Sequence, residues 1–97
     1  MKRLVGVILA TTVLLTSCAE STDGAVLYRK YCAACHGSDL SGNVGPSLAA
    51  GTEAAASTDA EYRMAIQEGI NEMAAVSALD DLRVDAVVAY LRQVQAQ

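Results

Sequence analysis

A pair of cysteines followed directly by a histidine, Cys32-Ala33-Ala34-Cys35-His36, constrains this 97-residue chain more than any other feature. This spacing is typical of covalent haem attachment, in which each thiol adds to one vinyl group of the porphyrin and the adjacent imidazole binds the iron. The chain contains one histidine, and it stands in this motif. The motif predicts one covalently bound haem c with its iron, attached through Cys32 and Cys35, with His36 as an axial ligand.

Three other uses of the motif are less consistent with the sequence. A structural zinc site needs four ligands, and Cys18 is the only cysteine outside the motif. A thioredoxin-like dithiol accompanies a βαβ pattern, and the sequence has no convincing strand runs. A structural disulfide would leave the adjacent histidine unexplained.

The first residues have the pattern of an export signal. A basic start at Lys2 and Arg3 is followed by an apolar run over residues 4–15. The run is too short to span a bilayer, which takes about 20 apolar residues. Residues 1–17 are therefore interpreted as a signal peptide and excluded from the fold.

The end of this signal, residues 15–18 (LTSC), resembles the bacterial lipobox, in which the cysteine is lipidated and becomes the first mature residue. A diacylglycerol and an amide-linked chain supply more than the two hydrophobic signals that stable anchoring requires. The resemblance implies an exported protein, anchored to a bacterial membrane through Cys18 and facing the periplasm or the cell exterior. Residues 18–23 are then the lipidated cysteine and a short tether. Ordinary signal cleavage after Ala19, which discards Cys18, is the alternative.

Residues 24–97 form one small domain, and chains this short rarely fold on their own core alone. The sequence has four tyrosines but no Trp or Phe, so a haem would supply the large apolar body that the core lacks. Without the signal peptide, the chain has five basic and eleven acidic side chains, which gives a formal net charge of −6. This charge argues against nucleic acid, whose phosphates are bound by Lys and Arg. It favours redox partners with basic docking patches, although general solubility also explains it.

Apolar spacing and helix caps predict an all-α domain. Thr58 and Glu61 form a capping box, and Gly69 is suited to end the helix that this box begins. Asp80 is the expected N-cap of the last helix, which continues with an i, i+3, i+4, i+7 apolar stripe. The expected helices cover residues 24–34, residues 58–68 and the segment from residue 80 onwards.

Two segments between the helices are expected as loops, and one of them holds a candidate iron ligand. Residues 37–52 are rich in glycine, and residues 69–78 contain Met73. An electron carrier keeps nearly the same iron geometry in both oxidation states, and a thioether ligand favours the ferrous one. Met73 is preferred over Met64, because Met64 lies in a predicted helix where methionine usually fills the core. A water or an open site is the third possibility.

Together these segments resemble a class I c-type cytochrome over residues 24–92. Residues 24–37 (GAVLYRKYCAACHG) are similar to that family's first helix and haem motif. The resemblance implies a small cytochrome c fold, with three to four helices wrapped around one haem. It also implies that Gly24 and Tyr28 of the first helix pack against Tyr90 of the last.

Two further segments carry the resemblance. The GPSL segment that contains Pro46 is similar to the loop beneath the haem, which implies that the Pro46 carbonyl accepts a hydrogen bond from His36 and raises its basicity. Residues 66–69 followed by Met73 are similar to the axial-methionine segment. The family commonly has proline after this methionine, and Ala74 in its place implies a looser loop.

The resemblance implies a membrane-anchored carrier of single electrons between redox proteins, as a monomer or as a subunit of a larger oxidoreductase complex, and not itself an enzyme. A haem peroxidase or small-molecule reductase is an alternative. It needs an open iron position and a distal acid or base, and the single histidine is already used. A gas or redox sensor is the third alternative, in which a labile Met73 gives way to carbon monoxide or nitric oxide.

Overall fold

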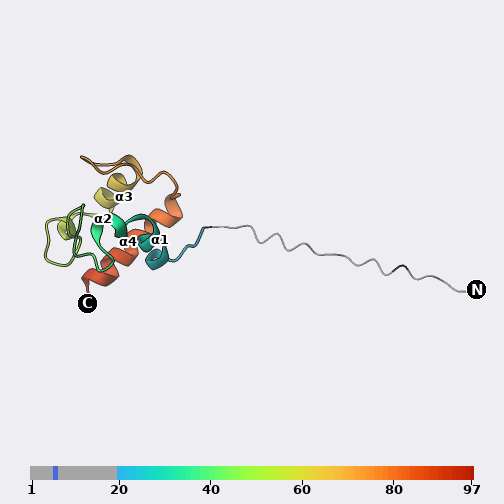
Figure 1. Ribbon diagram of the computed structural model, residues 1–97, viewed down its shortest axis with the longest axis horizontal. Coiled ribbons are helices and arrows are strands. Elements are labelled where there is room, and N and C mark those ends of the chain that lie inside the picture. The colour runs from blue at the N-terminus through green and yellow to red at the C-terminus, as the bar shows by residue number, and fades with distance from the viewer. Residues whose placement is uncertain (1–5, 7–19) are drawn as a thin grey trace, which may run out of the picture.

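The computed structural model describes Gly6 and residues 20–97, and helices account for its regular structure (Figure 1). The expected signal peptide and Cys18 lie outside the described residues. The elements are α1 (Gly24–Tyr31), α2 (Ala33–His36), the 3-10 helix η1 (Ala54–Ala56), α3 (Asp59–Glu68) and α4 (Asp81–Gln95). No strand is found within residues 20–97, and the prediction of a small all-α fold is confirmed.

Helix ends lie where the local signals of the sequence predict them. Thr58 Oγ1 accepts a hydrogen bond from the Glu61 amide at 3.1 Å, and Glu61 Oε1 accepts one from the Thr58 amide at 3.0 Å. Gly69 follows α3 with a φ of 81°, a conformation that favours glycine. The Asp80 side chain caps α4 by accepting from the amide three residues on. The capping box, the glycine stop and the Asp80 cap are confirmed.

The first helix is shorter than its apolar spacing predicts. Residues 24–34 were expected to form one helix, whereas α1 ends at Tyr31 and α2 begins at Ala33, with Cys32 between them at a φ of −119°. The Tyr28 hydroxyl donates to the Gly37 carbonyl at 2.6 Å, which holds the end of α2 against α1. The prediction of one continuous helix is wrong at Cys32, and the bond from Tyr28 to Gly37, which joins residues nine apart, could not be predicted from local spacing.

The two terminal helices of the domain, α1 and α4, cross at Gly24. A β-carbon on Gly24 would overlap the Ala86 carbonyl and lie 2.9 Å from Tyr90 Cβ, so only glycine permits this approach. The rings of Tyr28 and Tyr90 lie beside the crossing, with centroids 5.4 Å apart and planes tilted by 44°. This geometry is typical of a favourable aromatic pair.

Apolar side chains of the helices and loops form one core. Tyr62 and Ile66, four residues apart on α3, both point into it, and Leu79 and Val84 pack into it as well. Met64 is 60% exposed, so its expected place as core filler is wrong. The core comprises Leu27, Tyr28, Cys32, Leu40, Leu48, Tyr62, Ile66, Leu79, Val84, Val87, Val88 and Leu91.

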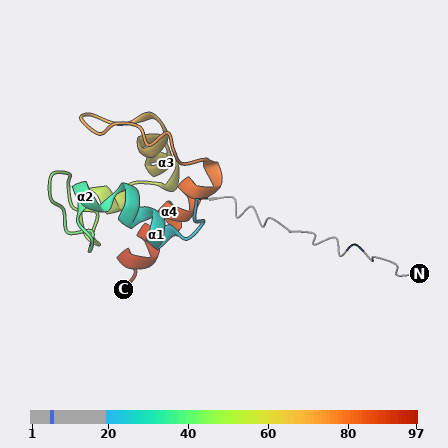
Figure 2. The same ribbon diagram turned by 45° about the vertical axis from the view of Figure 1, so that its right-hand side comes forward.

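The two long loops, residues 37–52 and residues 69–78, project beside α2 and beyond α3. Figures 1 and 2 both show the 37–52 loop and the tip of the 69–78 loop lying away from the place where residues 20–23 join the domain, whereas the end of the 69–78 loop returns to α4 near that place. None of the helices within residues 20–97 combines the length and the apolarity that a bilayer crossing requires.

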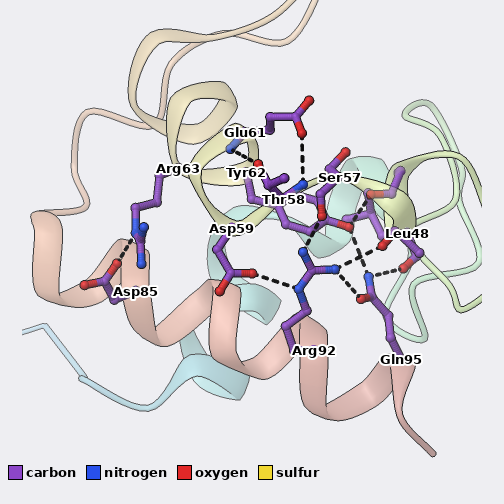
Figure 3. A network of polar contacts seen from close by, with 12 residues as sticks. Leu48, Ser57, Thr58, Asp59, Glu61, Tyr62, Arg63, Asp85, Arg92 and Gln95 are labelled. Atoms are coloured by element: carbon purple, nitrogen blue, oxygen red, sulfur yellow. Dashed lines mark hydrogen bonds and ion pairs between the residues drawn. The ribbon is translucent and has the colours of Figure 1, made fainter.

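Arg92 of α4 holds the segment that leads into α3 (Figure 3). Its guanidinium donates to the Asp59 carboxylate at 2.9 Å and to the Ala55 carbonyl at 3.0 Å, and it also donates to the Ser57 carbonyl. The guanidinium carbon lies 4.8 Å from the centre of the Tyr62 ring. A planar fork of five donors reaches acceptors that lie apart from one another, whereas the three donors of an ammonium share one nitrogen.

We expect Arg92→Lys to lower the free energy of unfolding by about 1–3 kcal/mol, because partly buried carbonyls lose their donors. Arg63→Lys is the control, since Arg63 makes an ion pair with Asp85 and both side chains are exposed. Exposed pairs contribute only about 0–1 kcal/mol. Denaturant unfolding compares the two variants, and equal losses would contradict the role given to Arg92.

Candidate haem site

The short helix α2 places both cysteines and the histidine within one turn. The amides of Cys35 and His36 donate to the Cys32 carbonyl at 3.2 and 2.9 Å. Both sulfurs are free thiols, with Cys32 buried and Cys35 exposed. Two thiols held this close are available to form bonds with one ligand.

Burial raises the pKa of the Cys32 thiol to about 11, with a smaller contribution from neighbouring Cys35. No cluster of three or more His, Cys, Asp or Glu side chains able to hold a metal ion occurs among the described residues. The site therefore gives no support to the zinc alternative.

The imidazole of His36 is held in one tautomer. The residue is 9% exposed, and Nδ1 lies 2.8 Å from the Pro46 carbonyl oxygen. A carbonyl only accepts, so Nδ1 carries the proton and donates, and Nε2 keeps its lone pair. This arrangement presents Nε2 to a metal, and the hydrogen bond makes the imidazole a stronger ligand.

Gly45 is a site residue to which sequence reasoning gave no role of its own. A β-carbon at this position would lie 3.0 Å from His36 Cε1 and 3.1 Å from Nδ1, so the imidazole packs on bare backbone. The Gly45 amide also donates to the Cys35 carbonyl at 2.7 Å. Its place directly before Pro46, in a loop expected to contact His36, is the signal that could have identified it.

Further hydrogen bonds attach the 37–52 loop and α1 to α2. The Gly42 amide donates to the His36 carbonyl at 2.7 Å, and the Asn43 side chain donates to the Ala34 carbonyl at 3.3 Å. Burial raises the pKa of Tyr28 to about 12, so its hydroxyl stays protonated and can donate to the residue after His36. Contacts from α1 and from the 37–52 loop thus fix the position of α2 and of its imidazole.

Met73 lies in the 69–78 loop, and its half-buried side chain packs against the core. Its backbone exchanges two hydrogen bonds with Ile70, at 2.8 and 3.0 Å. A β-carbon on Gly69 would lie 2.7 Å from the Met73 carbonyl oxygen, so glycine is needed for the loop to approach α3. These contacts brace the Met73 backbone although residue 74 is alanine.

This set of donors fits a covalently attached haem. Cys32 and Cys35 offer two free thiols, His36 offers Nε2 with its lone pair, and Met73 offers a thioether from a braced loop. These are the groups that thioether attachment and two axial ligands require. The fold and the site together define a c-type cytochrome.

Comparison with known proteins places the chain more narrowly. Residues 19–91 match the family model described as cytochrome c oxidase, cbb3-type, subunit III. The chain belongs to this family, so it carries covalently bound haem c with its iron and transfers electrons. The prediction of the cofactor is thereby confirmed.

One curated relative has a name that refers to a redox reaction. The chain is 36% identical over 94 residues to dihydro-heme d1 dehydrogenase of Pseudomonas aeruginosa (strain PAO1). The alignment covers 94% of this chain and 19% of the relative. The chain therefore spans about a fifth of the length of that relative.

We expect Gly45→Ala to displace the imidazole of His36 and to weaken the bond from Nδ1 to Pro46. A less basic imidazole stabilises the ferric state less, so the midpoint potential rises. Overpacking of this kind costs about 1–3 kcal/mol of stability. Redox titration and denaturant unfolding measure the two effects.

Gly51→Ala is the control for this prediction. A β-carbon on Gly51 meets nothing within 4 Å, but its φ of 80° strains any other residue. The control should lose stability and keep the midpoint potential of the wild type. A shift of the potential in Gly51→Ala, or none in Gly45→Ala, would contradict the contact with His36 as the cause.

Proposed function

We propose that this chain is a monohaem electron carrier in which Cys32 and Cys35 hold the haem by thioether bonds and His36 and Met73 bind the iron. The bound haem supplies a one-electron couple between ferric and ferrous iron. The bond from His36 Nδ1 to the Pro46 carbonyl, 2.8 Å long, is the observation that carries the proposal. It leaves Nε2 as the nitrogen free to bind a metal.

The residues of the site favour a carrier over an enzyme. A thioether from Met73 would fill the second axial position, and the one histidine of the chain is engaged at the first. No imidazole is then left to act as a distal acid or base, which a peroxidase needs. The backbone pairing of Met73 with Ile70 also opposes the exchange of ligands that a gas sensor requires.

A role as the electron-transfer part of a larger redox enzyme is the second candidate. The relative from Pseudomonas aeruginosa is named a dehydrogenase, and this chain matches only a fifth of it. We propose that the matched part is the one that carries electrons. This chain would then work as a monomer or as a subunit, with partners that present basic docking patches to its excess of acidic residues.

We further propose that the chain is exported and that Cys18 anchors it to a bacterial membrane by lipidation. The basic start, the short apolar run and the LTSC segment support this proposal. An anchored carrier searches for its partners in the plane of the membrane. Two acyl signals are sufficient for stable attachment.

Absorption spectra of the purified protein in both redox states test the proposed ligands. We expect a c-type α-band and, in the ferric state, the weak far-red charge-transfer band of an iron–thioether bond. Met73→Ala should abolish the far-red band and lower the midpoint potential, because a thioether favours ferrous iron. Met64→Ala is the matched control and should leave both unchanged, since Met64 is 60% exposed on α3.

The opposite results would identify the alternatives. A wild-type spectrum without the far-red band, together with rapid binding of carbon monoxide by the reduced protein, would favour the sensor or the peroxidase. Loss of the band in Met64→Ala alone would transfer the ligand role to that residue.

Cys18→Ser tests the proposed anchor. We expect the wild type to carry a lipid of matching mass on Cys18 and to sediment with membranes, and the variant to appear in the soluble exported fraction. Ala19→Ser is the control and should stay on the membrane. A wild-type protein that begins at Glu20 and carries no lipid would show ordinary signal cleavage instead.

A further inference from the structure

The segment that precedes α1 is bonded to the folded domain. The Glu20 carboxylate accepts hydrogen bonds from Lys30 Nζ at 3.1 and 3.2 Å and from the Tyr31 hydroxyl at 3.0 Å. The Glu20 carbonyl accepts a hydrogen bond from Arg83 of α4 at 2.7 Å. Glu20, Lys30, Tyr31 and Arg83 thus join the start of the segment to both α1 and α4. We call this group the Glu20 clamp.

Arg83 makes the clamp more than an ion pair at the surface. An exposed pair alone restrains a chain weakly, but the Arg83 side chain is only 16% exposed. Its guanidinium donates to the Asp80 carboxylate, at 2.6 Å, and to the Glu20 carbonyl. A planar group held by two acceptors has little freedom to move.

The Glu20 carboxylate is also stabilised in its charged form. Hydrogen bonds from Lys30 first, and then from Tyr31, hold the pKa of this carboxyl below its ordinary value. The side-chain half of the clamp is therefore in its bonding state at neutral pH. The backbone half, from Arg83 to the Glu20 carbonyl, involves no titration of Glu20.

The clamp lies very close in sequence to the proposed anchor. Cys18 precedes Glu20 by two residues, and two residues span at most about 7 Å. A lipid on Cys18 would therefore enter the bilayer beside the clamp. A chain of this length leaves the domain little room to turn once Glu20 is held.

We propose that the Glu20 clamp fixes which face of the domain lies on the lipid surface. The clamp side faces the headgroups, and the 37–52 loop and the tip of the 69–78 loop, which carry Pro46 and Met73, point away from the bilayer (Figures 1 and 2). The inference rests on the proposed lipidation of Cys18. A redox partner then meets these loops from the aqueous side.

Paramagnetic broadening of amide signals tests this orientation. The lipidated, reduced holo-protein is placed in lipid nanodiscs whose headgroups carry a gadolinium chelate. We expect strong broadening at Ser21 and Thr22, and little at Val44, which lies in the 37–52 loop and is 86% exposed. Similar broadening at all three positions of the wild type would overturn the proposal.

Two variants leave the lipidation sequence intact and open the clamp. Lys30→Gln with Tyr31→Phe removes the side-chain half, and Arg83→Gln removes the bond to the Glu20 carbonyl. Each should reduce the difference in broadening several-fold, with the largest loss when all three changes are combined. Arg63→Gln, which breaks an exposed ion pair elsewhere on α3 and α4, is the matched control. An unchanged difference in the combined variant would contradict the role of the clamp.

The clamp and the anchor can fail separately. Mass spectrometry shows whether Cys18 carries a lipid, and its absence would refute the anchor. In that case, heteronuclear NOE values at Ser21 and Thr22 of the reduced protein in solution decide the clamp. The clamp is supported if these values are as high as those of α1 in the wild type and fall in the combined variant. The low values of a free terminus in the wild type would overturn it with or without the lipid.

Discussion

The close crossing of α1 and α4 at Gly24 is the constraint on which the rest of the domain depends. Because the Gly24 backbone rests on the Ala86 carbonyl, the two helices approach closely enough for Tyr28 and Tyr90 to pair. The same Tyr28 reaches Gly37 with its hydroxyl and so fixes the end of α2. The position of the haem motif is therefore set by helix packing, and the chemistry of the motif acts within that frame.

The two proposed iron ligands are held by different kinds of contact. His36 is restrained by Pro46, by the bare backbone of Gly45 and by hydrogen bonds that join the 37–52 loop to α2. Met73 depends on a paired turn with Ile70 and on packing against the core. Local stability follows the density of such contacts. The Met73 side is therefore the one that opens at the lower cost in free energy.

Much of the fold could be predicted from the sequence, because helix caps act over three or four residues. Thr58, Gly69 and Asp80 mark the ends of helices by their own side chains or by the lack of one. The motif likewise indicated the cofactor, since covalent attachment needs both thiols and the histidine in fixed order. These are features that a short stretch of sequence contains in full.

Contacts between distant segments could not be predicted in this way. The break at Cys32, the exposure of Met64 and the contact of Gly45 with His36 depend on which segments meet after folding. A place in a predicted helix suggested that Met64 fills the core, but its side chain is 60% exposed. The bonds of Glu20 join residues up to 63 apart and have no signature in composition.

The first helix, α1, packs against the last helix, α4, and this contact affects the order in which the chain folds. α1 meets its partner only when α4 is available, and Gln95 of α4 donates to the Leu48 carbonyl and to the Tyr62 hydroxyl. A chain that emerges N-terminus first, from a ribosome or through a membrane, therefore presents Cys32 and Cys35 well before the domain can close. The length of sequence from His36 to Gln95 therefore sets the interval during which both thiols are accessible to the machinery that attaches the haem.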